Sequence, residues 1–212
     1  MRTFMALLLS NETKRRLAQV TAELKLTGAD VKWVEEDNFH ITLFFFGDIT
    51  PDTCDAIIGR MPEMTAGFLP ITLRLEKMGA FPNLRKPRVI WAGVEEGGRE
   101  IISVHRRVLE IVESLGFKED KKFSPHVTVG RVRLQQGSQN KFAHRGQGEP
   151  GSFAGDRRDR DSIESLNKLV NAMENVHYIS EDCIRGISLM ESVLTPKGAI
   201  YSELAFSKFE KL

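Results

Sequence analysis

Two copies of one short pattern stand out in the sequence: a histidine, an apolar residue, a threonine and a second apolar residue. The first copy begins at His40 and contains Thr42, and the second begins at His126 and contains Thr128. Because side chains alternate between the two faces of a β-strand, each copy presents an imidazole and a hydroxyl on one face. The apolar residues point to the opposite face, where they can anchor the strand.

Two imidazoles and two hydroxyls around one small anion suit the cleavage of a phosphodiester without a metal ion. One imidazole can take a proton from an attacking water while the other gives a proton to the leaving oxygen. The ordinary histidine pKa of about 6.5 allows both roles near neutral pH. The threonine hydroxyls can donate hydrogen bonds to the nonbridging oxygens. The preference of threonine for strands would explain a single copy, but two copies in matching contexts favour a catalytic pair.

The elements that must position these residues alternate between strands and helices. We expect strands at residues 3–9, 31–34, 40–46, 71–78, 88–94, 127–132, 184–193 and 199–206. We expect helices at residues 11–24, 51–64, 99–115 and 162–173. This order predicts an α+β protein with two related halves, each a small antiparallel sheet backed by helices.

One segment, residues 135–161, is rich in Gly, Gln, Arg and Asp and nearly free of aliphatic residues. Such a composition buries too little apolar surface to offset the entropy that is lost on ordering. We therefore expect a mobile loop, inserted into the second half of a single domain that spans residues 1–212.

The composition of the chain argues against several classes of protein. A net charge of +1 disfavours binding to long duplex nucleic acid by charge alone, but it leaves room for a local basic cleft. No apolar stretch approaches the ~18 residues of a membrane-spanning helix, and no signal-peptide pattern is present, so we expect a cytoplasmic protein without membrane contact. Cys54 and Cys183 lie outside any CxxC motif, so no zinc site is predicted; we expect two buried free thiols, with a disulfide as the alternative.

Three residues outside the motifs also bear on the predicted site, and one of them, Arg131, allows two interpretations. Strict alternation places Arg131 on the face opposite His126, as a solvated charge, but Gly130 permits a bulge that would turn Arg131 toward a bound phosphate. His105 lies on a predicted helix beside two arginines, and we expect it at the surface. Phe81, in a predicted loop, is a candidate for stacking on a base.

The chain resembles the 2H phosphoesterases, and within them the RNA 2′,3′-cyclic phosphodiesterases, historically called 2′-5′ RNA ligases. The resemblance covers nearly the whole chain apart from residues 135–161. It rests on RTF from residue 2, NFHITLFFFG from residue 38, PRVIW from residue 87, FSPHVTVGR from residue 123, and SVL from residue 192 with Gly198 and Tyr201. The doubled motif marks the superfamily, and the flanking residues favour this branch.

The resemblance implies a bilobal fold with the active site between the lobes, and hydrolysis of a 2′,3′-cyclic phosphate on an RNA end to a 2′-phosphomonoester. It implies that His40 donates a proton to the departing O3′, that His126 is the base that activates water, and that Arg131 contacts the phosphate. The residues alone do not decide between the two histidines, because the motifs are locally equivalent. The resemblance also implies a reverse reaction that joins RNA ends through a 2′-5′ bond.

Two other functions remain open at this point. The same site could act on a small cyclic nucleotide or a nucleotide-sugar cyclic phosphate. The cleft could instead hold a nucleotide or an RNA end without catalysis, although binding alone does not require two titratable groups. For the enzyme we expect a monomer that uses no metal or other cofactor. We also expect no use of a nucleoside triphosphate, since no GxxxxGK[ST] loop occurs to hold one.

Overall fold

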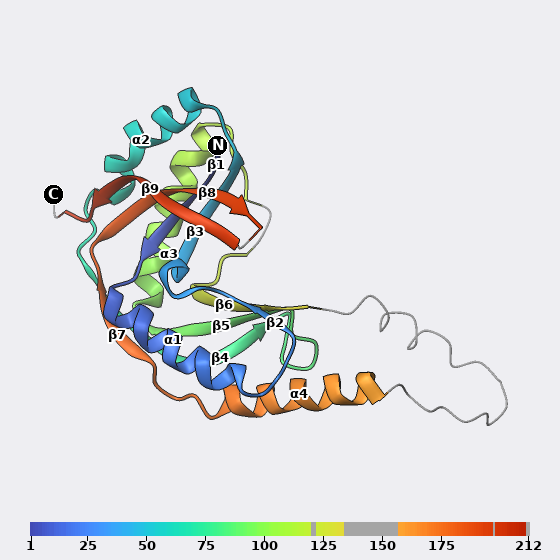
Figure 1. Cartoon of the computed structure of the whole chain (residues 1–212). Coiled ribbons are helices and arrows are strands. Elements are labelled where there is room, and N and C mark those ends of the chain that lie inside the picture. The colour runs from blue at the N-terminus through green and yellow to red at the C-terminus, as the bar shows by residue number, and fades with distance from the viewer. Residues whose placement is uncertain (120–121, 134–156, 197, 211–212) are drawn as a thin grey trace, which may run out of the picture.

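The computed structural model describes residues 1–119, 122–133, 157–196 and 198–210, which form two antiparallel sheets with helices around them (Figure 1). The first sheet has the strand order β3-β1-β8-β9, with β1 at Arg2–Leu8, β3 at His40–Asp48, β8 at Gly186–Thr195 and β9 at Gly198–Lys208. The second has the order β2-β6-β5-β4-β7, with β2 at Val31–Trp33, β4 at Ile71–Phe81, β5 at Val89–Glu96, β6 at His126–Val132 and β7 at Ser180–Ile184.

Helices back both sheets, as the sequence predicts. The helices are α1 (Asn11–Lys25), α2 (Pro51–Thr65), α3 (Gly98–Ser114) and α4 (Arg157–Glu174), and a short 3-10 helix, η1, covers Glu36–Asn38. In the first sheet α2 packs on β8 and β9 and α3 packs on β3, whereas in the second α1 packs on β7 and α4 on β4. Among the described residues, no helix combines the length and the apolar character that a membrane crossing requires.

The two sheets do not correspond to successive halves of the chain, which corrects the expectation from the sequence. The first sheet combines β1 and β3 with β8 and β9 from the opposite end of the chain, and β2 belongs to the second sheet although it lies between β1 and β3 in sequence. The chain therefore passes repeatedly from one sheet to the other. The alternation of strands and helices predicts the types of element, but it is compatible with more than one pairing.

Several smaller expectations also need correction. The strand expected at residues 184–193 is two strands, because the chain leaves β7 of one sheet after Ile184 and enters β8 of the other at Gly186. The helix α4 begins at Arg157 rather than residue 162, because arginine favours helices even where the apolar spacing used for the prediction is absent. Residues 135–156 of the expected loop lie outside the described residues. Both cysteines are free, but Cys183 is exposed, whereas Cys54 is buried as expected.

A β-bulge occurs at the same place in both motif strands. In β3 the residues on either side of Leu43 pair with consecutive residues of β1, so Leu43 is an extra residue. In β6 the residues on either side of Val129 pair with consecutive residues of β5, so Val129 is an extra residue too. A bulge interrupts the alternation of side chains. The later residues Phe45 and Arg131, each five positions after its histidine, can therefore return to the face on which the histidine lies.

Candidate active site

The strands that carry the two motifs, β3 and β6, are in contact although they belong to different sheets (Figure 1). Each motif starts at the first residue of its strand. Positive charge on His126 contributes to lowering the pKa of His40, so the two imidazoles lie within electrostatic reach of each other. The fold thus brings together two motifs that are far apart in sequence.

The two imidazoles are held by equivalent contacts. His40 Nδ1 lies 2.7 Å from the carbonyl oxygen of Asn38, and His126 Nδ1 lies 2.7 Å from the carbonyl oxygen of Ser124. A carbonyl oxygen only accepts hydrogen bonds, so in both rings Nδ1 carries a proton. In each neutral ring Nε2 is then the basic nitrogen that is available for proton transfer.

The threonines of the motifs have the positions that alternation predicts. Thr42 Oγ1 lies 2.9 Å from Nε2 of His40, so its hydroxyl donates to the neutral imidazole. Thr128 is half-buried on β6, two residues after His126, as Thr42 is two residues after His40. When His40 becomes protonated, Nε2 no longer accepts a hydrogen bond, and the Thr42 hydroxyl becomes free to donate to a ligand.

Aromatic rings from other strands of the first sheet surround His40. The ring of Phe4 on β1 lies 4.9 Å from the imidazole, and the ring of Tyr201 on β9 lies edge-on to it at 5.5 Å. Burial raises the pKa of Tyr201, so its hydroxyl stays protonated and able to donate at neutral pH. Sequence reasoning did not select Tyr201 as a site residue, because its position against His40 depends on pairing between distant strands.

The surroundings of His126 are also aromatic. The ring of Phe81 lies edge-on to His126 at 5.0 Å, and Trp91 lies 5.4 Å from Phe81. Phe81 is the last residue of β4 rather than part of a loop. Together with Lys77 and Glu95, these three rings line a cavity of about 240 Å³.

The charge of Arg131 acts on two groups of the candidate site. This charge adds to the decrease in the pKa of His126 and opposes the increase in the pKa of Tyr201, which places the guanidinium within electrostatic reach of both groups. Strict alternation would have put Arg131 on the opposite face, and the bulge at Val129 is the reason that it does not. Of the two interpretations that the sequence left open, this geometry favours a residue that serves the site.

A family model described as LigT-like phosphoesterase matches residues 7–91 of the chain. An RNA 2′,3′-cyclic phosphodiesterase of Archaeoglobus fulgidus is 33% identical over 204 residues, which cover 96% of this chain and 98% of the relative. A protein of the same name from Aeropyrum pernix is 32% identical over 190 residues, which cover 89% of this chain and 92% of the relative. The chain belongs to the LigT-like phosphoesterases.

Solved structures share the fold of this LigT-like phosphoesterase. A protein of Thermus thermophilus superposes with a TM-score of 0.72 at 22% identity, over 99% of this chain and 98% of that protein. Escherichia coli LigT, solved in complex with 3′-AMP, superposes with a TM-score of 0.68 at 19% identity, over 98% of this chain and 97% of that protein. These likenesses support the arrangement of two antiparallel sheets with helices behind them.

The environment of the phosphoesterase site lowers the pKa of both histidines. Burial lowers the pKa of His40 to about 4, against the opposing effect of the Asn38 carbonyl, and the charges of Lys14 and His126 add to the decrease. Burial also lowers the pKa of His126, and the charge of Arg131 adds to that decrease. Both rings are therefore neutral at pH 7 in the free protein. A bound phosphate anion would favour their protonated forms.

The other histidines do not extend the site. His105 is buried, contrary to expectation; its ring stacks on Phe123 at 3.8 Å, and its Nε2 lies 3.0 Å from Oε2 of Glu119. His177 is exposed beyond the end of α4, and His144 lies outside the described residues. Within the described part of the chain, no group of three or more His, Cys, Asp or Glu side chains is arranged to hold a metal ion.

The indole that lines the cavity beside His126 depends on a glycine across the sheet. Gly79 pairs with Trp91, and a Cβ at Gly79 would overlap the indole ring. We expect Gly79→Ala to displace Trp91 and to lower the free energy of unfolding, measured in urea, by about 1–3 kcal/mol. Gly59→Ala in α2 is the matched control, because its Cβ would meet nothing within 4 Å, and it should be stabilising by about 0.5–1 kcal/mol. A Gly79→Ala protein as stable as the wild type would contradict this account of the indole.

Proposed function

We propose that this phosphoesterase hydrolyses the 2′,3′-cyclic phosphate at the 3′ end of RNA to a 2′-phosphomonoester, with His40 and His126 as an acid–base pair. The main support is that both imidazoles start equivalent motifs on contacting strands, have the same Nδ1 contact to a carbonyl, and lie within electrostatic reach of each other. The names of the relatives point to the same reaction. One chain supplies both motifs, so a monomer is sufficient.

The reaction requires one proton to be taken up and one to be released. Neutral His126 takes a proton from water through Nε2 while the water oxygen attacks the phosphorus. The bond from phosphorus to O3′ breaks, and protonated His40 gives its Nε2 proton to O3′, which leaves a 3′-hydroxyl and a 2′-phosphate. Exchange of protons with solvent then restores both rings. With a 5′-hydroxyl in the place of water, the same groups in the same roles would join that hydroxyl to the phosphorus through a 2′-5′ bond, with O3′ as the leaving group.

The remaining site residues stabilise charge on the phosphate. The hydroxyls of Thr42 and Thr128 donate to the nonbridging oxygens, and the Arg131 guanidinium offers charge-assisted hydrogen bonds to the same group. Protonation of His40 releases the Thr42 hydroxyl for this purpose.

An oligonucleotide that ends in a 2′,3′-cyclic phosphate tests this function directly. We expect a product with a 2′-phosphate and a 3′-hydroxyl. A 2′-specific phosphatase should remove this phosphate, and a 3′-specific phosphatase should leave it in place. The rate should be the same with and without a chelator, because the two imidazoles carry both proton transfers. A 3′-phosphate product, or an intact cyclic phosphate, would exclude the proposed reaction, and a rate that is lost with chelator and restored by a divalent ion would exclude the proposed mechanism.

A further inference from the structure

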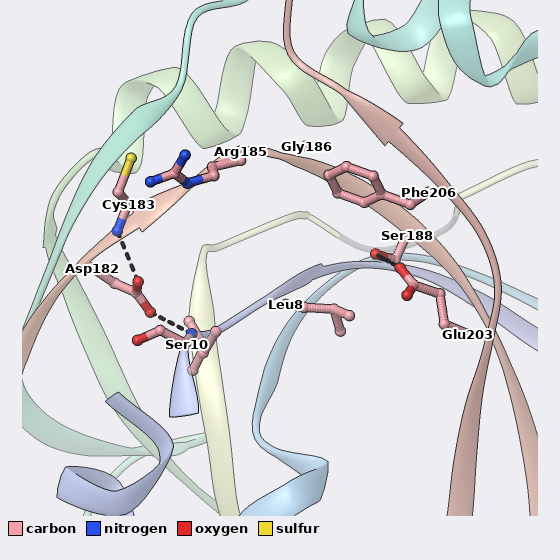
Figure 2. A pocket seen from close by; sticks show the side chains of 10 residues that line it. Leu8, Ser10, Asp182, Cys183, Arg185, Gly186, Ser188, Glu203 and Phe206 are labelled. Carbon is pink, nitrogen blue, oxygen red and sulfur yellow. Dashed lines mark hydrogen bonds between the residues drawn. The ribbon is translucent and has the colours of Figure 1, made fainter. Parts of the chain in front are cut away.

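A second cavity lies apart from the two histidines and is larger than the cavity beside His126. Its volume is about 450 Å³, and its walls come from β1, β7, β8, β9 and the connection between β7 and β8 (Figure 2). The side chains that line it include Leu8, Asp182, Arg185, Ser188, Glu203 and Phe206. None of these residues is part of the two motifs, and no step of the proposed reaction uses them.

This cavity opens on the same face of the first sheet as His40. Leu8 is the cross-strand partner of His40, and it packs with Phe4 and Tyr201, the two rings that contact the His40 imidazole. From β3, which carries His40, to β9, which carries Phe206, the sheet order gives three strand spacings, or about 14 Å. The cavity is therefore a neighbour of the active site along a continuous surface.

The chemistry of the cavity suits a nucleotide. The ring of Phe206 is 54% exposed, and it lies so close to Gly186 that a Cβ there would come within 2.7 Å of it. An exposed aromatic ring is a platform on which any base can stack. Arg185 is exposed at the opposite side of the cavity in Figure 2, and among the described residues no carboxylate lies within ion-pair distance of it.

The two acidic residues of the cavity are already engaged by the protein. Asp182 accepts hydrogen bonds from the backbone amides of Ser10 and Cys183, both at 2.8 Å (Figure 2). The hydroxyl of Ser188, itself buried, donates to Glu203 at 2.7 Å. These contacts disperse negative charge, yet Glu203 keeps further acceptor positions for a ribose hydroxyl or a base amino group.

We propose that this cavity binds a nucleotide of the RNA strand upstream of the cyclic phosphate, so that the preferred substrate is an oligonucleotide rather than a mononucleotide. This inference rests on the proposed function, in which the 3′ end of the RNA lies between His40 and His126. From that end the strand can continue only in the 5′ direction. The base of the terminal nucleotide stays close to its own phosphate, whereas the stacking ring of Phe206 is on β9, three strand spacings from β3, so that ring is within reach only of a longer strand.

The test compares two substrates with the same reacting group. The kcat/KM of the wild type and of Phe206→Ala and Arg185→Ala is measured on a 2′,3′-cyclic mononucleotide and on a short oligonucleotide that ends in the same cyclic nucleotide. We expect the wild type to prefer the oligonucleotide. We expect each variant to lose at least about fivefold in kcat/KM on the oligonucleotide, from loss of stacking or of a phosphate contact. The kcat/KM of both variants on the mononucleotide should equal that of the wild type.

Two further variants serve as controls for this comparison. Phe206→Tyr keeps an aromatic ring and should retain the wild-type preference for the oligonucleotide. Leu26→Ala removes an apolar side chain that is 87% exposed and lies outside the cavity, so kcat/KM should stay unchanged on both substrates. Equal losses on both substrates, or no loss on the oligonucleotide, would overturn the role of the cavity while hydrolysis of the mononucleotide upholds the proposed reaction. A wild type that hydrolyses neither substrate would instead refute the proposed function itself.

Discussion

Replacing His40 or His126 by alanine is expected to lower kcat on a cyclic-phosphate substrate by about 10²–10⁴-fold for each variant, because each removes one of the two proton transfers. The double variant should be little worse than either single variant, since the two groups act in one concerted event. Steady-state rates on the same cyclic-phosphate oligonucleotide measure both effects. Circular dichroism and thermal unfolding should show a folded protein in each case, because both histidines are only partly buried.

The matched control for these variants is His177→Ala, which removes an exposed imidazole beyond the end of α4. Its activity should equal that of the wild type. If either His40→Ala or His126→Ala kept full activity in a folded protein, the acid–base pair would have to be abandoned. An equal loss in His177→Ala would show that the assay responds to something other than the site.

The second large effect is expected in the dependence of the rate on pH. Burial holds the pKa of both histidines below 6.5, at about 4 for His40, and the active form of the free enzyme needs one ring protonated and the other neutral. Above both pKa values the protonated fraction falls tenfold per pH unit. We therefore expect kcat/KM, which reports the free enzyme, to follow a bell with its maximum below pH 6.5 and to fall about 100-fold over two units on the alkaline side. The bell for kcat should lie at higher pH, because the bound phosphate favours protonated histidine.

Arg131→Gln provides the control for this interpretation. The charge of Arg131 contributes to lowering the pKa of His126, so its removal should raise that pKa and move the corresponding limb of the kcat/KM profile to higher pH. The limb that belongs to His40 should stay in place, since Arg131 is not among the charges that act on it. A kcat/KM profile that is flat between pH 6 and pH 8.5 would contradict the assignment of both pKa values.

The motif strands were predictable because their pattern is local. A histidine and a threonine two residues apart define a face of a strand, and the structure has a strand at both places. Helix ends were predictable for a similar reason, since Ser10 and Thr50 accept hydrogen bonds from backbone amides in the first turns of α1 and α2. Long-range pairing was not predictable, and with it the contact of Tyr201 with His40 was missed.

The sequence left the orientation of Arg131 open and placed His105 wrongly, each for an identifiable physical reason. For Arg131 the sequence offered two faces, and only the register between β5 and β6 shows the bulge that selects one of them. For His105 a local signal was present and was overlooked. Ile101 and Val108 lie four residues before it and three after it, and both are buried, so the helical period places His105 on the apolar face of α3. Its arginine neighbours in sequence lie on other faces of the same helix.

The repeated passage of the chain between the sheets has a consequence for the architecture of the enzyme. The connections β1–β2, β2–β3, β3–β4 and β7–β8 each join one sheet to the other, so no single cut in the backbone separates the lobe of His40 from the lobe of His126. Truncation at either terminus removes strands that the remaining sheet needs for its pairing. Because these connections join the two lobes several times, we expect neither lobe to fold when its strands are expressed without those of the other.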